Sequence, residues 1–441
     1  MRWSARDNVN YMMTGVVSSL SYTADNGELL LRNFYRKGVN NLERGRTQTP
    51  HAFVIPKDQR DPRRAAYLIN QLQRQAIEVH QRMSGDSAGD YVVLLNQPYR
   101  NLAVTLLTTQ DFPEDAEHPP YDDIAWTLGY LYGVEVNAVD DSAVFRWRGL
   151  DLLEDTVAYT GTLAGSGSIH LIENRAQDEI LPALYWLRER APGARAFAAE
   201  AQFDAGTATD GEDNGSTAAT FEAGTVILEG VDTETAQQLT QQFGLDVRAT
   251  AAAPEVARHE LDLPRVAIYH TWFSTQDEGW ARFTLEQLAI PYTSIDKDDL
   301  RAGDLLNRFD VILVPSVGGS VEQLIHGIDS KLGPMPFTKT AEYPSHGTPD
   351  ATDDMTGGPG FIGLDHLQRF VEGGGVLVTL ANATALAAET GITRVLSRHA
   401  ANGLFHPGSV VRAKARRPDH PILYGFPEQP HVFRGNGSLY S

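Results

Sequence analysis

The strongest constraint on the fold is a strict alternation of strand-like and helix-like segments over residues 264–380. Short apolar runs occupy 265–270, 292–295, 311–315 and 376–380, and segments with helical apolar spacing lie between them at 277–288, 300–307 and 364–371. Strands that alternate with helices at this length predict an α/β fold with a doubly wound parallel sheet. Ligands of such sheets bind beyond the carboxyl ends of the strands.

The remainder of the chain is predicted to form two further parts. Apolar residues recur every three or four positions over residues 1–48, which indicates a lead-in of two helices. Residues 49–260 predict a middle α/β domain, in which the strands after residue 168 are compatible with continuing the first sheet. Within it, residues 203–220 are rich in Gly, Thr, Asp and Ala and predict a mobile loop. Residues 261–441 form the carboxy-terminal domain.

Composition excludes several classes of function. The 441 residues include 37 basic and 57 acidic side chains, a formal net charge of −20, which repels nucleic-acid phosphates and makes nucleic acid an unfavourable partner. No apolar run approaches the ~18 residues that a membrane span needs. The chain has no cysteine, so disulfides, thiolate metal sites and cysteine nucleophiles are excluded. The first eight residues are polar and carry no export signal.

Several motifs resemble one protein family. The segments 277–287, 301–305, 309–312, 370–375 and 407–409 resemble the domain appended to one group of zinc carboxypeptidase-like proteins, a domain similar to class I glutamine amidotransferases. The segments 33–38, 99–100 and 120–128 resemble the region that joins the peptidase to that domain in the same group. The resemblance therefore spans nearly the whole chain.

The resemblance implies that the peptidase domain itself lies outside this sequence. Residues 1–48 correspond to its terminal helices, and its zinc ligands, substrate-binding Arg and general base would all precede Met1. We therefore expect a fragment of a longer protein at both ends, zinc only in the missing domain, and no cofactor in this chain. The intact family member would be a metallocarboxypeptidase, a hydrolase, and it would be exported if the missing part carries a signal peptide.

Two local patterns could suggest a metal site and a catalytic nucleophile, but the sequence around each disfavours that function. His170 and Glu173 form a His-x-x-Glu pair, but on a strand these positions point to opposite faces, so we expect an ordinary strand and no metal site. The resemblance places a cysteine nucleophile on the turn after the strand 376–380, where this chain reads Ala381-Asn382-Ala383-Thr384. No base is placed to activate Thr384, so no catalytic residue is predicted.

The best candidate pocket lies at the start of the helix 277–288. Trp272, Asp277, Glu278 and Trp280 are placed where an indole face and carboxylates would suit a sugar or a cationic peptide end. The structural alternative is that the two acids only complement the helix dipole while Trp280 packs beneath them.

Two further motifs complete the set of candidate ligand-binding residues. Gly358, Gly360 and Gly363 form a Gly-x-Gly-x-x-Gly pattern before a helix, but no strand precedes it and no acidic ribose partner follows it, which disfavours a dinucleotide site. We interpret the pattern as a glycine-rich entry that lets the helix pack closely, whose free N–H groups could also hold a carboxylate or another anion. His406 and Ser409 belong to a loop motif of the family, and His346 is an isolated loop histidine.

The sequence thus predicts a non-catalytic part that scaffolds or binds substrate for an absent peptidase domain. The alternative is a stand-alone sugar- or peptide-binding module that uses the amidotransferase-like pocket. Apolar residues of the lead-in, Leu29 to Leu31, Phe34 and Tyr35, would have packed on the missing domain and could drive self-association.

Overall fold

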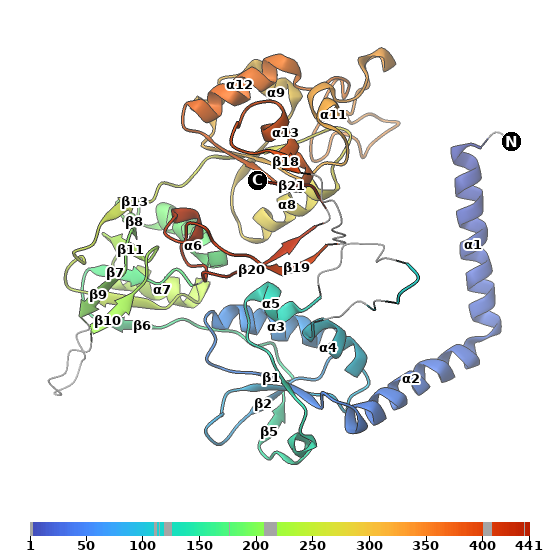
Figure 1. Ribbon diagram of the computed structural model, residues 1–441, viewed down its shortest axis with the longest axis vertical. Helices are drawn as coiled ribbons and strands as arrows, with labels where there is room; N and C mark the ends of the chain where they lie inside the picture. Colours follow the sequence, from blue (N-terminus) through green and yellow to red (C-terminus); the bar gives the residue numbers. More distant parts are fainter. Residues whose placement is uncertain are drawn as a thin grey trace. The chain divides into compact units, whose positions relative to one another are not determined.

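A computed structural model describes residues 3–109, 113, 115–118, 126–175, 177–206, 218–399, 408–435 and 437–441 (Figure 1). The chain is a mixed α/β protein with several sheets, one of them parallel. It divides into two compact units: unit 1 comprises residues 1–117 and 125–159, and unit 2 comprises residues 118–124 and 160–441. In the part that the structure describes, no helix is long and apolar enough to cross a membrane.

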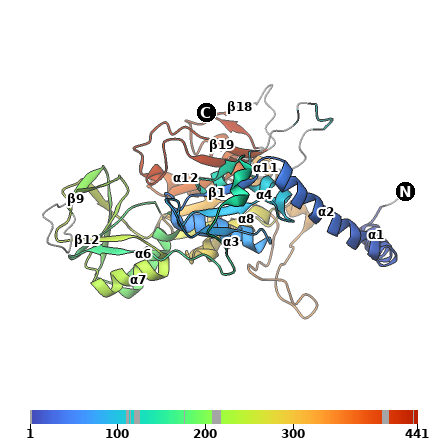
Figure 2. The ribbon, with the colours of Figure 1, turned by 90° about the horizontal axis from the view of Figure 1, so that it is seen from below.

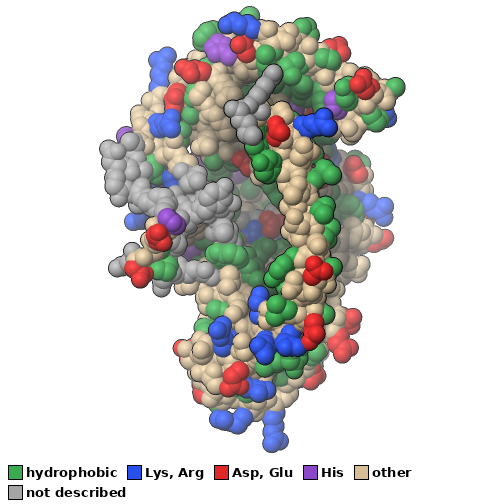
Figure 3. Space-filling view, turned by 90° about the vertical axis from the view of Figure 1, so that its right-hand side faces the viewer, with side chains coloured by type: hydrophobic (Ala, Val, Ile, Leu, Met, Phe, Trp, Pro, Cys, Tyr) green, Lys and Arg blue, Asp and Glu red, His purple; other side chains and the backbone are tan. Residues whose placement is uncertain are grey.

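Unit 1 begins with the two helices that the sequence predicts, α1 (Ala5–Asp25) and α2 (Gly27–Thr47). Ser4 and Asp7 form a capping box at the start of α1, whose residues are all exposed or half-buried. The end of α2 is anchored instead, because Gly45 is buried where a Cβ atom would lie 1.9 Å from the carbonyl oxygen of Leu95. Hydrophobic side chains consequently remain uncovered along these helices (Figure 3).

The body of unit 1 is a five-stranded sheet with the order β4-β1-β3-β2-β5. Its strands are β1 (Ala52–Ile55), β2 (His80–Arg82), β3 (Tyr91–Leu94), β4 (Asn137–Val139) and β5 (Leu150–Leu152), and its helices are α3 (Pro62–Arg74), α4 (Arg100–Leu107), α5 (Leu128–Tyr132) and the 3-10 helix η1 (Ser142–Arg146). Asp61 caps α3 and Pro62 occupies its first turn, as the sequence predicts. Of the helix predicted over residues 121–132, residues 121–125 lie outside the described residues, and α5 covers Leu128–Tyr132.

Unit 2 begins with a second, six-stranded sheet, in the order β13-β8-β11-β7-β12-β6. The elements of this part are β6 (Leu163–Gly165), β7 (Ile169–Ile172), α6 (Gln177–Arg190), β8 (Arg195–Ala199), β9 (Phe203–Gly206), β10 (Ala218–Phe221), β11 (Val226–Glu229), α7 (Thr233–Phe243), β12 (Val247–Thr250) and β13 (Arg258–Glu260). Helices α6 and α7 pack on one face of the sheet (Figure 2). The hairpin of β9 and β10 packs on the other face.

Two expectations about this region are wrong. The strands after residue 168 do not continue the first sheet, because β7, β8, β11 and β12 pair with one another and with β6 and β13. The ends of the predicted loop 203–220 are paired strands, since Phe203 and Phe221 stack at 5.2 Å between ring centroids and supply the apolar burial that composition alone does not reveal. Residues 207–217 of that loop lie outside the described residues.

The parallel sheet predicted for the carboxy-terminal part is present, with the order β15-β14-β16-β17. Its elements are β14 (Val266–Tyr269), α8 (Gln276–Gln287), β15 (Tyr292–Ile295), α9 (Lys297–Ala302), α10 (Leu305–Arg308), β16 (Val311–Val314), α11 (Val321–His326), η2 (Ser330–Leu332), α12 (Gly360–Glu372), β17 (Val376–Thr379), η3 (Ala381–Ala383) and α13 (Thr384–Glu389). One predicted helix, 300–307, is divided into α9 and α10 by Gly303 and Asp304. We call residues 264–389 the parallel-sheet part.

The chain ends in two short antiparallel pairs. Strand β18 (Arg398–His399) pairs with β21 (Leu439–Tyr440), and β19 (Ser409–Arg412) pairs with β20 (His431–Arg434), with the 3-10 helix η4 (Pro421–Leu423) between β19 and β20.

Candidate functional site

Four charged or polar side chains meet at the carboxyl end of strand β14. His270 directly follows β14, Glu278 and Arg282 lie on α8, and Asp350 belongs to the segment between α11 and α12. We call these four residues the His270 cluster. Its position matches the edge where parallel sheets bind ligands.

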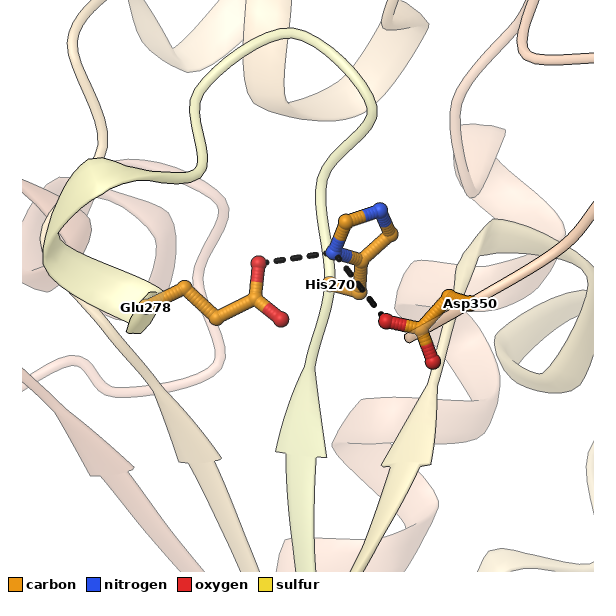
Figure 4. A group of neighbouring side chains, drawn as sticks. All are labelled: His270, Glu278 and Asp350. Carbon is orange, nitrogen blue, oxygen red and sulfur yellow. Dashed lines mark hydrogen bonds and ion pairs between the residues drawn. The ribbon is translucent and has the colours of Figure 1, made fainter. Parts of the chain in front are cut away.

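His270 and Glu278 are joined by a short, buried hydrogen bond. The Nδ1 atom of His270 lies 2.7 Å from Oε2 of Glu278, and the two residues are only 8% and 3% exposed (Figure 4). An ionised carboxylate can only accept, so the shared proton belongs to Nδ1. The bond fixes the orientation of the ring and leaves the Nε2 atom on the side away from both carboxylates (Figure 4).

Arg282 pairs with the buried carboxylate of Glu278 and with the half-buried carboxylate of Asp350. Its Nε donates to Oε1 of Glu278 at 2.7 Å, and its Nη2 donates to Oδ2 of Asp350 and to Oγ of Ser294, both at 2.6 Å. Burial opposes the charge of the guanidinium, but the attraction of Glu278 and Asp350 outweighs it and raises the pKa of Arg282. Arg282 is therefore a permanent cation between two acids that come from different segments of the chain.

The same residues could in principle hold a metal ion. One ligand atom each of His270, Glu278 and Asp350 lies within 4.8 Å of the others, the single group of this kind that the described residues form. However, Arg282 already donates to both carboxylates, and Nδ1 of His270 is engaged with Glu278. A metal would have to displace this guanidinium, so the arrangement fits a hydrogen-bonded ion-pair network better than a metal centre.

The Nε2 atom of His270 is buried and has no hydrogen-bond partner among the described residues. A small cavity lies beside this histidine, with room for about one water molecule. Its lining includes Trp272, Lys297, Met355, Gly357 and Gly358. An unsatisfied buried polar atom is costly, so it marks a place where a ligand atom or a water would be bound favourably.

Glycine backbone separates this cavity from an outer hollow of about 450 Å³. Gly327, Gly357 and Gly358 line both spaces, and a Cβ atom on Gly327 would lie 2.0 Å from the carbonyl oxygen of Gly357. The hollow is also lined by Arg301, His326 and Gly360. Only residues without side chains permit so thin a wall between the two spaces.

A row of aromatic rings extends outward from the cluster. Trp272 contacts His270 edge-on at 4.3 Å between centroids and approaches Phe337 at 5.8 Å. His346 stacks on Phe337 at 4.7 Å and on Tyr343 at 4.9 Å. Since Tyr343 is 49% exposed while His270 is buried, the row connects the surface with the His270 cluster.

The structure brings some of the predicted pocket residues together and separates others. Glu278 is in the His270 cluster, and Trp272 lines the adjoining cavity and donates from Nε1 to Asp296 at 3.1 Å. Asp277 is exposed in the first turn of α8, and Trp280 is 65% exposed with Phe283 as its ring neighbour at 5.9 Å. The idea that Trp280 packs beneath the acids is therefore wrong, because its position on α8 faces solvent.

The remaining predicted residues lie in three places. Gly358 lines the cavity and the hollow, and Gly360 begins α12 with a φ of 61° beside open space. Ser409 is the first residue of β19. His406 lies outside the described residues.

His170 and Glu173 do not form a site. His170 is 1% exposed in the middle of β7, and its two ring nitrogens have no hydrogen-bond partner in the described residues. Glu173 instead forms an ion pair with Arg175. The prediction of a strand is confirmed.

Sequence reasoning missed His270, Arg282 and Asp350. The sequence contained a signal that could have found Arg282, because Glu278 and Arg282 have the i, i+4 spacing of a helical ion pair. Asp350 lies 68 residues beyond Arg282 in a segment without regular periodicity, so no local signal could have placed it.

In comparisons with known proteins, no family model, curated protein or solved structure matches this chain.

Proposed function

We propose that the parallel-sheet part is a non-catalytic binding module for a sugar, anchored by a hydroxyl on Nε2 of His270. The observation that carries the proposal is this buried nitrogen, whose ring is held in place by Glu278 and which has no hydrogen-bond partner in the part of the chain that the structure describes. A hydroxyl can either donate or accept a hydrogen bond, so it satisfies Nε2 whether or not that nitrogen carries a proton.

The aromatic row supports a sugar over a peptide terminus. The apolar faces of sugar rings pack well against flat aromatic side chains, and the aromatic row runs from Trp272 beside the cluster to Tyr343, which is 49% exposed.

The turn after β17 supports the absence of catalysis. Ala381 has a φ of 46°, an uncommon conformation for a residue with a side chain, between strand β17 and helix α13. The family resemblance places a nucleophile on this turn, and the alanine methyl group cannot serve as one. We therefore interpret the part as an amidotransferase-like, doubly wound domain that has kept a ligand site without a nucleophile.

The test is thermal unfolding of the whole chain with a panel of sugars and short peptides at saturating concentrations. Binding to the folded state raises the melting temperature. We expect stabilisation by at least one sugar in the wild type and in Trp280→Ala, and its loss in Trp272→Ala. Stabilisation by peptides alone, or equal effects of the two tryptophan substitutions, would overturn the proposal.

The lead-in helices favour a second role, that of scaffold for a peptidase domain. Leu31, Phe34 and Tyr35 of α2 are 72%, 68% and 71% exposed, and such a run of large apolar side chains is a common docking surface. The family resemblance implies a zinc carboxypeptidase domain as the partner, which would bring the zinc and the hydrolytic activity.

A mixing experiment tests this second role. We expect a separately produced peptidase domain of the family to coelute with the whole chain in size-exclusion chromatography and to bring the complex its zinc. The triple substitution Leu31→Ser, Phe34→Ser and Tyr35→Ser should abolish coelution. Zinc bound by this chain alone, or coelution that the triple variant retains, would argue against it.

A further inference from the structure

A row of cationic side chains begins at Arg412, the last residue of strand β19, in the tail of unit 2; Figure 1 locates the strand. Arg412, Lys414 and Arg416 are exposed, while Val411, Ala413 and Ala415 between them are half-buried. This alternation is the period of an extended strand, so the three cations share one face at intervals of roughly 7 Å.

Main-chain hydrogen bonds show that the strand continues past its formal end. The N–H of Ala413 donates to Pro430 at 2.9 Å, and the N–H of Ala415 donates to Glu428 at 3.1 Å, in register with the β19–β20 pairs. Since neighbouring N–H groups of a strand point to opposite edges, those of Arg412, Lys414 and Arg416 point outward. No strand of the described residues pairs with that outer edge.

The three cations also lack partners of opposite charge. In the described ranges none of Arg412, Lys414 and Arg416 forms an ion pair or a side-chain hydrogen bond. The chain as a whole carries a net charge of −20, so this unpaired cationic row is a positively charged patch on an acidic protein. Such a row attracts an acidic partner that the rest of the surface repels.

We propose that this edge binds an extended acidic peptide segment of a partner protein, which adds as a strand beside β19. Outward N–H groups bond the peptide main chain, and acidic side chains at every second position pair with Arg412, Lys414 and Arg416. A peptide fits better than a polyphosphate or a nucleic acid, because only a peptide main chain satisfies the strand edge as well as the cations.

The test is fluorescence anisotropy with the whole chain and two labelled eight-residue peptides. One peptide alternates Glu and Thr, and the other has the same composition with all Glu residues adjacent. We expect the alternating peptide to bind about tenfold more tightly, because its acids match the period of the strand. Equal affinities, or no binding of either peptide, would overturn the proposal.

Charge variants locate the binding. Arg412→Ser, Lys414→Ser and Arg416→Ser together should weaken binding tenfold or more, since each exposed pair contributes roughly two- to fivefold. The matched control removes three exposed cations of α2 by Arg36→Ser, Lys37→Ser and Arg46→Ser, and should change affinity less than twofold. Equal losses would show non-specific attraction and contradict the proposal.

A backbone variant separates strand addition from simple charge attraction. Lys414→Pro removes one outward N–H without breaking the ladder to β20, whereas Lys414→Ser removes only the charge. We expect Lys414→Pro to bind several-fold more weakly than Lys414→Ser. Equal affinities of the two variants, or a polyphosphate that displaces the peptide at lower concentration than unlabelled peptide does, would overturn it.

Discussion

Two histidines are buried in two different sheets of unit 2, and their surroundings differ sharply. His270 follows a strand of the parallel sheet and donates to Glu278, whose charge is balanced by Arg282. His170 lies within β7 of the six-stranded sheet and has no such partner. The carboxyl ends of parallel strands open into loops where polar side chains can converge, whereas mid-strand positions between covered faces meet mostly apolar neighbours.

The two histidines therefore differ in kind: His270 has the surroundings of a ligand-binding residue, whereas His170 is a buried polar side chain without a binding role. Loss of hydration lowers the pKa of His170, and the nearby negative charge of Asp232 only partly opposes this effect. His170 is therefore neutral in the folded chain at pH 7, and its two nitrogens find no hydrogen-bond partner among the described residues. At His270 one nitrogen is satisfied, the other has no partner among the described residues, and the residue lines a small cavity, which is the arrangement expected of a ligand site.

The largest effect should follow removal of the central cation. Arg282→Met leaves the buried Glu278 without its cation and the half-buried Asp350 without its ion-pair partner, and should lower the free energy of unfolding by about 3–5 kcal/mol. Arg369, also an i, i+4 partner of a helical acid but 70% exposed, provides the control. Arg369→Met should cost about 0.3–0.5 kcal/mol in the same urea denaturation series. Similar costs for the two variants would remove the basis for a buried network.

Leucine substitutions at the two histidines should act in opposite directions. His270→Leu strips Glu278 of a hydrogen-bond donor and should lower stability by about 1–3 kcal/mol, whereas His170→Leu removes an unsatisfied buried group and should raise stability by about 1 kcal/mol. Urea denaturation at pH 7.5 measures both variants. Changes of the same sign would contradict the contrast between the two sheets.

The pH dependence of stability should also identify His170. Its pKa is lowered from 6.5 in the folded chain, so the unfolded chain binds the proton more readily. Stability from this group is therefore complete above pH 6.5 and decreases as the pH falls below it, by up to ~1.4 kcal/mol per pH unit. Denaturation from pH 7.5 to pH 5 should show a shallower decline in His170→Leu than in the wild type. Identical declines would exclude His170 as their source.

The smallest effects are expected at two residues that sequence reasoning placed in the pocket. Asp277 and Trp280 face solvent on α8, so Asp277→Asn and Trp280→Ala should change stability by less than about 0.5 kcal/mol. Both should leave sugar binding intact. A loss of sugar binding in either variant would show that the site extends along α8 to that residue.

Periodicity predicted the parallel sheet well because its strands are short, apolar and separated by amphipathic helices. Strand β15 matches its predicted bounds, and β14, β16 and β17 differ from theirs by one or two residues. Local pattern failed for residues 203–220, where the pairing of β9 with β10 depends on two phenylalanines on either side of a polar stretch.

The candidate site was only half visible in the sequence. Trp272 and Glu278 stand near the end of a predicted strand, so the carboxyl-edge rule located them. Arg282 lies four residues after Glu278 on the same helix and was open to local reasoning, whereas Asp350 enters through a tertiary contact with Arg282, and their 68-residue separation leaves no trace in local spacing. Asp277 and Trp280 were grouped with them because sequence proximity on a helix does not distinguish its buried face from its exposed face when the apolar pattern is weak.

The most direct test of the sugar site is the ring nitrogen spectrum of His270 in chain labelled with ¹⁵N-histidine, assigned by comparison with His270→Gln. We predict that Nδ1 is protonated and bonded to Glu278 in the free chain, and that a stabilising sugar shifts the Nε2 signal while Nδ1 keeps its proton. An Nε2 signal that remains unchanged with every sugar in the panel would contradict the account.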